Sequence, residues 1–367
     1  MLRTILTAGV FVSAVAFLAP AVTAGDISAR ARKLHFSSII VDTHDDTTQR
    51  FLDGKFDLGA RSATGSIDIP RMREGNLSAI FFSIWIPSKI TGPEAVNRAM
   101  TQIDAVREQV RKHPNDLVLA TTAAEIRAAR KQGRIAALMG VEGGHMINSD
   151  LGLLRSYAAL GVRYMTLTHS GNDEWADSST DKPIHNGLTD FGKDVIREMN
   201  RVGMVVDVSH MGYRATLDAF EVSSKPVIFS HSNPNGLREH ARNITDDQIK
   251  ACAQTGGVIG INGIGDFLGG ISSELIVQNI EYVINLVGPD HAGIGLDYVV
   301  DKQEVLDYIK NNPGVFPADK MADFIAFVEP EQIPEFTELL CQKGYSDQII
   351  SGILGGNFLR VAKEVWK

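Results

Sequence analysis

Short apolar segments recur along the chain and are its strongest structural signal. Each has the length and composition of a buried strand, and most are followed by a polar or ionisable residue. The eight segments span 39–41, 77–86, 135–141, 162–168, 204–209, 226–230, 257–262 and 292–296. A strand that is apolar on both faces is typical of a parallel sheet covered by helices.

Amphipathic segments lie between most of these strands. After Pro93, apolar residues recur every three or four positions, which predicts a helix with one buried face. Thr122 with Glu125, and Thr245 with Gln248, have the spacing of capping boxes that begin two further helices.

The alternation of strands and helices predicts βα units and a parallel sheet. Eight units in a domain of this length favour a closed (β/α)8 TIM barrel, with an open doubly wound sheet as the alternative. The rhythm is interrupted over about 299–328, a region we interpret as a candidate cover for an active site. The segment 331–367 is predicted to form a C-terminal helical extension, interrupted at Gly344 and at Gly355–Gly356.

The first 24 residues have the pattern of a signal peptide. Arg3 precedes an apolar stretch over 5–19, and Val-Thr-Ala at 22–24 is a small-residue cleavage site. We therefore expect a cleaved signal peptide over 1–24 and a single metallohydrolase domain over 25–367, exported to the periplasm or secreted. No later segment is apolar and long enough to cross a bilayer, so no transmembrane anchor is expected in the mature chain.

Composition narrows the classes of function. An apolar content of 44% is ordinary for a globular core. A net charge of −8, without a basic run, argues against a nucleic-acid partner. The two cysteines, Cys252 and Cys341, do not form a disulfide framework. Export would permit a bond between them, and two buried thiols are an equally good interpretation.

Ionisable residues stand at the ends of six of the predicted strands. His44 and Asp46 follow the first strand, and because residues i and i+2 of a strand point the same way, they can face one point. The others are Glu142, His169, His210, His231 and Asp297. In a barrel these strand ends converge on one face, where active sites are built. Imidazole and carboxylate are ligands that zinc prefers, and four terminal ligands with a bridging carboxylate suit two metal ions. The pattern predicts metal-assisted hydrolysis, with a single-metal site as the alternative.

Several motifs also occur in a characteristic order. They are Asp-Thr-His-Asp-Asp (42–46), Gly-Val-Glu-Gly-Gly-His (140–145), Tyr-Met-Thr-Leu-Thr-His-Ser (164–170), Val-Asp-Val-Ser-His (206–210), Pro-Val-Ile-Phe-Ser-His-Ser (226–232), Ala-Arg-Asn (241–243) and Gly-Gly-Asn-Phe-Leu-Arg-Val (355–361). Through them the sequence resembles the membrane (renal-type) dipeptidases, peptidase family M19 of the amidohydrolase superfamily, over nearly all of the mature chain.

The resemblance implies a binuclear zinc site. His44 and Asp46 would bind one Zn²⁺, His210 and His231 would bind the second, and Glu142 would bridge the two. A hydroxide held between the zinc ions would attack the peptide carbonyl.

The same resemblance implies roles for three further residues. Asp297 would act as general base and then general acid. His169 would hold the scissile carbonyl or the developing oxyanion. Arg242 would pair with the free carboxylate of a dipeptide. From the residues alone, Arg242 could equally be a solvated arginine in a loop with Arg238.

The predicted function is that of a zinc-dependent dipeptidase for small dipeptides. The resemblance implies that the enzyme accepts a C-terminal D-residue. It also leaves open that the protein forms a homodimer. One alternative is an amidohydrolase acting on a modified peptide, a lactam or an N-acyl amino acid. Another is a non-catalytic peptide- or metal-binding barrel, which the presence of both Asp297 and Glu142 disfavours. The family's Gly-x-Asp-Phe-Asp-Gly reads Gly-Leu-Asp-Tyr-Val-Val at 295–300, and the missing second aspartate puts substrate preference in question.

Overall fold

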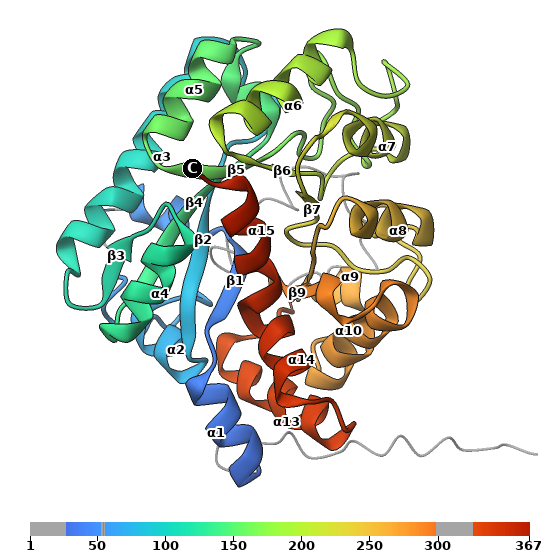
Figure 1. Cartoon of the computed structure of the whole chain (residues 1–367). Helices are drawn as coiled ribbons and strands as arrows, with labels where there is room; N and C mark the ends of the chain where they lie inside the picture. The colour runs from blue at the N-terminus through green and yellow to red at the C-terminus, as the bar shows by residue number, and fades with distance from the viewer. Residues whose placement is uncertain (1–26, 53, 55, 299–325) are drawn as a thin grey trace, which may run out of the picture.

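The structure is a computed structural model that describes residues 27–52, 54, 56–298 and 326–367 (Figure 1). The expected signal peptide and nearly all of the candidate cover lie outside these residues. The strands are β1 (Ile40–Asp45), β2 (Leu77–Trp85), β3 (Leu117–Leu119), β4 (Ile135–Glu142), β5 (Val162–Thr166), β6 (Val205–Asp207), β7 (Val227–Ile228), β8 (Ile259–Ile261) and β9 (Ala292–Ile294).

Helices follow most of the strands along the chain. The α-helices are α1 (Ala29–Ser37), α2 (Ile69–Glu74), α3 (Gly92–Lys112), α4 (Ala123–Lys131), α5 (Leu151–Ala159), α6 (Asp190–Val202), α7 (Tyr213–Val222), α8 (Asp246–Gln254), α9 (Gly265–Leu268), α10 (Ser273–Val287), α13 (Ile333–Gln342), α14 (Asp347–Ser351) and α15 (Asn357–Val365). Short 3-10 turns are η1 (Thr47–Leu52), η2 (Gly144–Ile147), η3 (Pro289–His291) and η5 (Pro330–Gln332), and η6 (Gly352–Gly356) is a π turn. Both predicted capping boxes are present at the starts of α4 and α8.

The strands form a parallel barrel, as predicted. Their order is β7-β6-β5-β4-β2-β1-β9-β8, and a parallel bridge between Phe229 and Ile259 joins its two ends. Every predicted strand is therefore a barrel strand, and the open doubly wound sheet is excluded. The short strand β3, which the sequence pattern did not reveal, pairs with the first half of β4 outside this order.

Alternating side chains on the strands build two separate cores. Phe82 points outward and packs with the helices, whereas Phe81 points into the barrel. Phe81 there meets Phe358 and Trp366 of the C-terminal segment, with ring centroids 5.3 and 6.1 Å away. Helix α15 thus lies across the barrel near the beginnings of the strands (Figure 1). The opposite end is left for the site.

Strand β4 shows how the interior changes from apolar to polar. Ala136 and Leu138 belong to the inner core, while Glu142, on the same face, lies at the strand end. Between them, Gly140 leaves room for the ring of Tyr164, which would be 2.1 Å from a Cβ atom at this position. A larger residue at Gly140 would therefore displace Tyr164.

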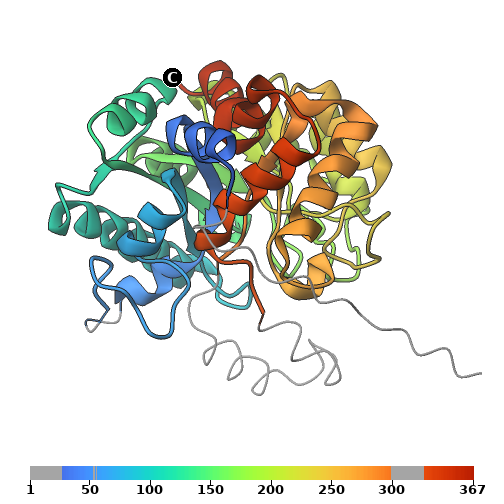
Figure 2. The same ribbon diagram turned by 90° about the horizontal axis from the view of Figure 1, so that it is seen from below.

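The N-terminal part of the chain contains helices that the pattern did not predict. Helix α1, capped by the Ser28 side chain, packs against α13 from the other end of the chain (Figure 2). Helix α2 and turn η1 lie in the stretch after β1 that showed no clear period. These elements are short, and their partners are distant in sequence, so local periodicity carried little signal.

Three smaller expectations can be compared with the structure. The C-terminal extension is helical, with a break at Gly344 and a kink at Gly355, where a Cβ atom would lie 2.5 Å from the Ile39 carbonyl oxygen. Cys252 is buried, Cys341 is half-buried, and both are free thiols. Within the described part of the chain, no helix is long and apolar enough to span a membrane.

Candidate active site

The barrel brings all the predicted site residues to the C-terminal ends of the strands. His44 lies on β1 and Glu142 ends β4, while Asp46 follows β1 directly. The segments after β5, β6, β7 and β9 supply the remaining strand-end residues, which are His169, His210, His231 and Asp297. All of them except Asp46 and His169 are buried, and these two are half-buried.

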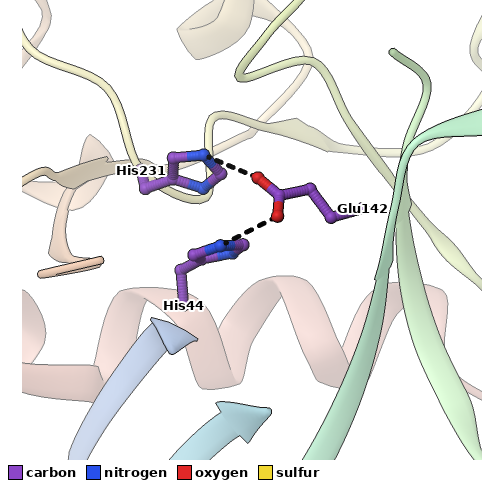
Figure 3. Close-up of side chains that lie close together, drawn as sticks. All are labelled: His44, Glu142 and His231. Carbon is purple, nitrogen blue, oxygen red and sulfur yellow. Dashed lines mark ion pairs between the residues drawn. The ribbon is translucent and has the colours of Figure 1, made fainter. Parts of the chain in front are cut away.

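Glu142 lies between two groups of potential ligands, and Figure 3 shows it between one member of each, His44 and His231. Its Oε2 atom is 3.4 Å from His44 Nε2, whereas its Oε1 atom is 3.4 Å from His231 Nε2 and 2.9 Å from His210 Nε2. Ser83 donates a hydrogen bond of 3.1 Å to Oε2. A carboxylate whose two oxygens face different sets of ligands can contact a cation through each oxygen.

The first set, which we call the acidic side, consists of His44, Asp46 and Asp297. His44 Nε2 is 3.7 Å from an oxygen of each aspartate. Among the described residues, neither His44 Nε2 nor Asp46 Oδ1 has a hydrogen-bond partner, although both atoms are buried. Since an unpaired buried polar atom is costly, a cation at this point would satisfy both.

The second set, which we call the imidazole side, consists of His169, His210 and His231. The Nε2 atoms of His210 and His231 are 2.9 Å apart, and the rings of His169 and His210 are 4.3 Å apart. Two ring nitrogens this close can direct their lone pairs at one cation. The nitrogen-rich donor set fits zinc.

The clusters of possible ligands differ from the predicted division, in which His44 and Asp46 bind one metal ion and His210 and His231 bind the other. Three clusters have ligand atoms within 4.8 Å of one another: His44, Glu142 and His231; Glu142, His169 and His210; His44, Asp46 and Asp297. The structure thus collects every predicted ligand in buried groups suited to metal. It also places His169 and Asp297, predicted to act on substrate, within the same range.

Burial and charge shift the pKa values of the two sides in opposite directions. Burial raises the pKa of Asp297 to about 7, reinforced by the negative charges of Asp46 and Glu142. Burial lowers the pKa of His210 and of His231. Neighbouring positive groups, Arg242 among them, lower both pKa values further. Burial also lowers the pKa of His169 to about 4. The imidazole side is therefore neutral at neutral pH.

Asp297 occupies a constrained position. Its φ of +60° lies in the left-handed region that most side chains avoid, and its Oδ2 accepts a 2.7 Å hydrogen bond from Asn262. The preceding residue is also held, because the buried Asp42 accepts bonds from the backbone N–H groups of Leu296 and His44. Asp42 thus links the segment that carries His44 to the one that carries Asp297.

Arg242 is buried rather than solvated, so the interpretation of a solvated arginine is wrong. Its guanidinium donates to the Ser209 carbonyl and to His210 Nε2, the latter at 3.0 Å. It also lies over the ring of Phe267, 5.5 Å from the centroid. Arg242 therefore places a positive charge directly beside the imidazole side.

Four residues that contact the site were not predicted from the sequence. Tyr164 places its hydroxyl 2.8 Å from His44 Nδ1, and Trp85 packs edge-on against His169. Ser230 contacts His231 Nδ1, and Asn262 contacts Asp297. Tyr164 precedes Thr166 by two positions on β5 and shares its inward face. This period of two was the signal that could have revealed it.

A parallel barrel with buried imidazoles and carboxylates at its C-terminal mouth defines a metallohydrolase of the TIM-barrel class. The sequence model of one family, described as membrane dipeptidase (peptidase family M19), matches residues 28–367. This chain belongs to that family and is a family M19 metallodipeptidase.

Individual relatives agree with this assignment. The chain is 32% identical to dipeptidase tcpJ of Claviceps purpurea over 323 residues, which is 83% of this chain and 70% of that protein. Its structure is similar to that of an amidohydrolase from Pseudomonas aeruginosa, with a TM-score of 0.75, 25% identity, and coverage of 92% and 99% of the two chains. A metallopeptidase from Rhodobacter sphaeroides, solved with a phosphinate mimic of the dipeptide L-Ala-D-Ala, shares the fold at 22% identity and a TM-score of 0.76, over 90% and 100% of the chains.

Proposed function

We propose that this protein is a zinc-dependent dipeptidase that holds two zinc ions per chain and hydrolyses small dipeptides with a free C-terminal carboxylate. The observation that carries the proposal is the placement of Glu142, whose two carboxylate oxygens face different sets of buried ligand atoms. A carboxylate serving only one metal ion, or only a structural ion pair, would not need a ligand set at each oxygen.

The proposed ligands are those implied by the family motifs. His44 and Asp46 would hold one zinc ion, His210 and His231 the other, and Glu142 would bridge them. When bound, the two zinc ions would make a water molecule nucleophilic near neutral pH and would polarise the substrate carbonyl.

Asp297 would transfer the proton. Its Oδ2 is occupied by Asn262, while its Oδ1 faces the interior of the acidic side, 3.7 Å from His44 Nε2. Oδ1 can therefore accept a proton from water and give it to the leaving amine. A pKa raised to about 7 suits a group that must change protonation state near neutral pH.

His169 and Arg242 would bind the substrate. His169 Nε2 is 3.9 Å from Glu142, farther than the nitrogens of His210 and His231, which supports a role toward the carbonyl rather than as a ligand. A neutral ring, which its lowered pKa favours, can donate a hydrogen bond to the developing oxyanion. Arg242 would offer further N–H groups to the carboxylate.

We also propose that the enzyme accepts a D-residue on the C-terminal side. The phosphinate mimic of L-Ala-D-Ala bound to the Rhodobacter metallopeptidase makes this dipeptide the natural first probe. The alternative substrates, a modified peptide, a lactam or an N-acyl amino acid, would use the same ligands. A modified peptide or a lactam would not need the free carboxylate that Arg242 is proposed to bind, whereas an N-acyl amino acid would still offer one.

The test is the metal content of the purified protein, measured together with hydrolysis of L-Ala-L-Ala, L-Ala-D-Ala and L-Ala-D-Ala amide, with and without a chelator. Two equivalents of zinc with chelator-sensitive cleavage of the free dipeptides would support the proposal. Zinc binding without cleavage of either dipeptide would favour the alternative substrates. A protein that binds no metal after reconstitution would overturn the proposal.

A further inference from the structure

Asp207, the last residue of β6, is a fully buried carboxylate close to the imidazole side without belonging to it. It accepts five hydrogen bonds. Its Oδ1 accepts from the backbone N–H of Ser209 at 3.2 Å, from the Ser209 hydroxyl at 2.8 Å and from the backbone N–H of Ser230 at 2.9 Å. Its Oδ2 accepts from the hydroxyls of Thr166 at 2.5 Å and Ser230 at 2.6 Å.

These bonds fix the direction of the Ser230 hydroxyl. A carboxylate can only accept, so the Ser230 proton points toward Asp207. The Ser230 oxygen also lies 2.8 Å from His231 Nδ1, and its remaining lone pairs can only accept there. A hydrogen bond between these two atoms therefore requires the His231 proton on Nδ1. Its Nε2 atom is left with a lone pair directed toward Glu142 and His210.

We infer that Asp207 and Ser230 are positioning residues that set the tautomer and orientation of His231, so that Nε2 is ready to bind a metal ion. The inference rests on the proposed function, because it takes His231 as a zinc ligand. A ligand histidine commonly donates a hydrogen bond from its second ring N–H to a carboxylate or carbonyl. Here the Ser230 hydroxyl stands between His231 and the carboxylate of Asp207, and we call this chain of hydrogen bonds the relay.

The other two ligand histidines lack this arrangement. His44 Nδ1 faces the hydroxyl of Tyr164, which can donate or accept and so imposes no tautomer. Within the described residues, His210 Nδ1 has no hydrogen-bond partner. The relay is therefore a specific property of His231, and its loss should affect the imidazole side before the acidic side.

Two substitutions test the relay in different ways. Ser230→Ala removes the acceptor for His231 Nδ1, while the backbone stays anchored, since the N–H of Ser230 donates to Asp207 and its carbonyl accepts from Thr43. Asp207→Asn keeps the shape of the side chain. Two backbone N–H groups require the amide oxygen at the Oδ1 position, so the amide nitrogen must face Thr166 and Ser230.

In Asp207→Asn the direction of hydrogen-bond donation along the relay reverses, so that it runs from residue 207 through Ser230 to His231. The new amide donates to the Ser230 oxygen, which frees the Ser230 proton to point at His231 Nδ1. The proton of His231 then moves to Nε2, where it blocks metal binding. Ser78→Ala is the matched control, because Ser78 is equally buried and its hydroxyl accepts from the Ile40 backbone, but it lies at the start of β2, away from the site.

The first readout is the histidine ¹⁵N spectrum of the metal-free protein at pH 8, with the His231 signals assigned by their loss in His231→Gln. We expect the Nδ1–H tautomer in the wild type and in Ser78→Ala, a mixture in Ser230→Ala, and the Nε2–H tautomer in Asp207→Asn. An Nε2–H tautomer in the wild type would overturn the inference, whatever the zinc content and the substrates of the protein.

The second readout is a zinc titration of the same proteins. We expect one equivalent to bind about 10–100-fold more weakly in Ser230→Ala and Asp207→Asn, with the other equivalent unchanged, because partners of ligand residues typically have effects of this size. A role limited to folding would weaken both equivalents or neither. If the wild type binds two zinc ions and cleaves dipeptides while both variants bind zinc equally well, the relay is wrong and the proposed function stands.

Discussion

The two sides of Glu142 differ in charge although they lie within one buried site. On the acidic side, a single imidazole is accompanied by two aspartates, Asp46 and Asp297. On the imidazole side, three neutral rings lie next to the cation of Arg242. Glu142 is the only carboxylate that the two sides share in the three ligand clusters of the described residues.

This difference indicates how the site would discriminate between metal ions. Asp46 in addition to Glu142, with the carboxylate of Asp297 close by, would favour many divalent cations on the acidic side. A site made largely of imidazoles, beside a positive charge, would favour a metal ion that binds nitrogen strongly, such as zinc. In the proposed site, the acidic side would supply charge and the imidazole side would supply selectivity.

The strongest test of this comparison is Glu142→Gln, which removes the anion that both sides share. Both zinc equivalents should weaken by more than about 100-fold, since even partners of ligand residues contribute 10–100-fold, and dipeptide cleavage should fall with them. Zinc titration and an assay on L-Ala-D-Ala measure the two effects. Glu335→Gln is the control, because Glu335 is a buried glutamate on α13 that accepts from Ser273 away from the site. Unchanged binding at either equivalent would refute the bridging role.

Asp297→Asn separates proton transfer from metal binding on the acidic side. Asparagine tolerates the left-handed φ of +60° at this position, so the backbone should be preserved. We expect kcat to fall by about 10²–10⁴-fold, the usual contribution of a general acid or base, with two zinc ions still bound. Asp46→Asn should show the opposite pattern, with loss of zinc first. Loss of zinc in Asp297→Asn would instead make Asp297 a ligand.

Arg242→Gln tests the cation beside the imidazole side. If Arg242 binds the substrate carboxylate, KM for L-Ala-D-Ala should rise by about 10–100-fold, because hydrogen bonds to charged groups contribute about 1.5–3 kcal/mol. Hydrolysis of L-Ala-D-Ala amide should be unaffected. Arg238→Gln, which removes a half-buried arginine that pairs with Asp266, is the control. Equal losses on both substrates would show that Arg242 acts through His210.

The acidic side should destabilise the metal-free protein as the pH rises. The pKa of Asp297 is raised from 3.8 to about 7, so its stabilising contribution is complete below pH 4 and is lost as the pH rises through 7. Asp297→Asn, which does not titrate, should therefore be more stable than the wild type above pH 7, by at most about 4 kcal/mol. Melting temperatures of chelator-treated protein between pH 4 and 8 measure this. A difference that does not grow with pH would contradict it.

The imidazole side should have the opposite pH dependence and a smaller effect. The pKa of His169 is lowered from 6.5 to about 4, so its contribution is complete above pH 6.5 and is lost as the pH falls to 4. His169→Gln should gain stability relative to the wild type below pH 6.5, by at most about 3 kcal/mol. The same melting experiment measures it. If the melting temperatures of Asp297→Asn and His169→Gln, relative to the wild type, changed in the same direction with pH, the predicted contrast between the two sides would be wrong.

Much of the fold could be predicted because each barrel strand is a continuous apolar run. Strands buried on both faces are apolar at nearly every position, as in Ile135–Val141, so the pattern is visible without knowing their partners. The short edge strand β3 and the helices α1 and α2 have weaker signals. Helix α1 is stable largely because it packs on α13, and no local pattern records that contact.

The site was predictable in its residues but not in its contacts. Polar residues directly after buried strands indicated where the chemistry lies, and the family motifs suggested roles for them. The solvated interpretation of Arg242 failed because a loop arginine in sequence gives no sign of the space beside His210 that it fills. Ser230 was overlooked because a serine next to a histidine is common, and only its 2.6 Å bond to Asp207 gives it significance.

The sequence by itself determined the order of strands and helices and the set of groups at the strand ends, because both depend on which side chains follow one another along the chain. Only the tertiary structure decided which oxygen of Glu142 faces His44 and which faces His231, and which nitrogen of His231 remains free. Those properties arise when closure of the barrel brings β1, β4, β6 and β7 around one point. The distances between their side chains depend on strand register and burial, which no local stretch of the sequence contains.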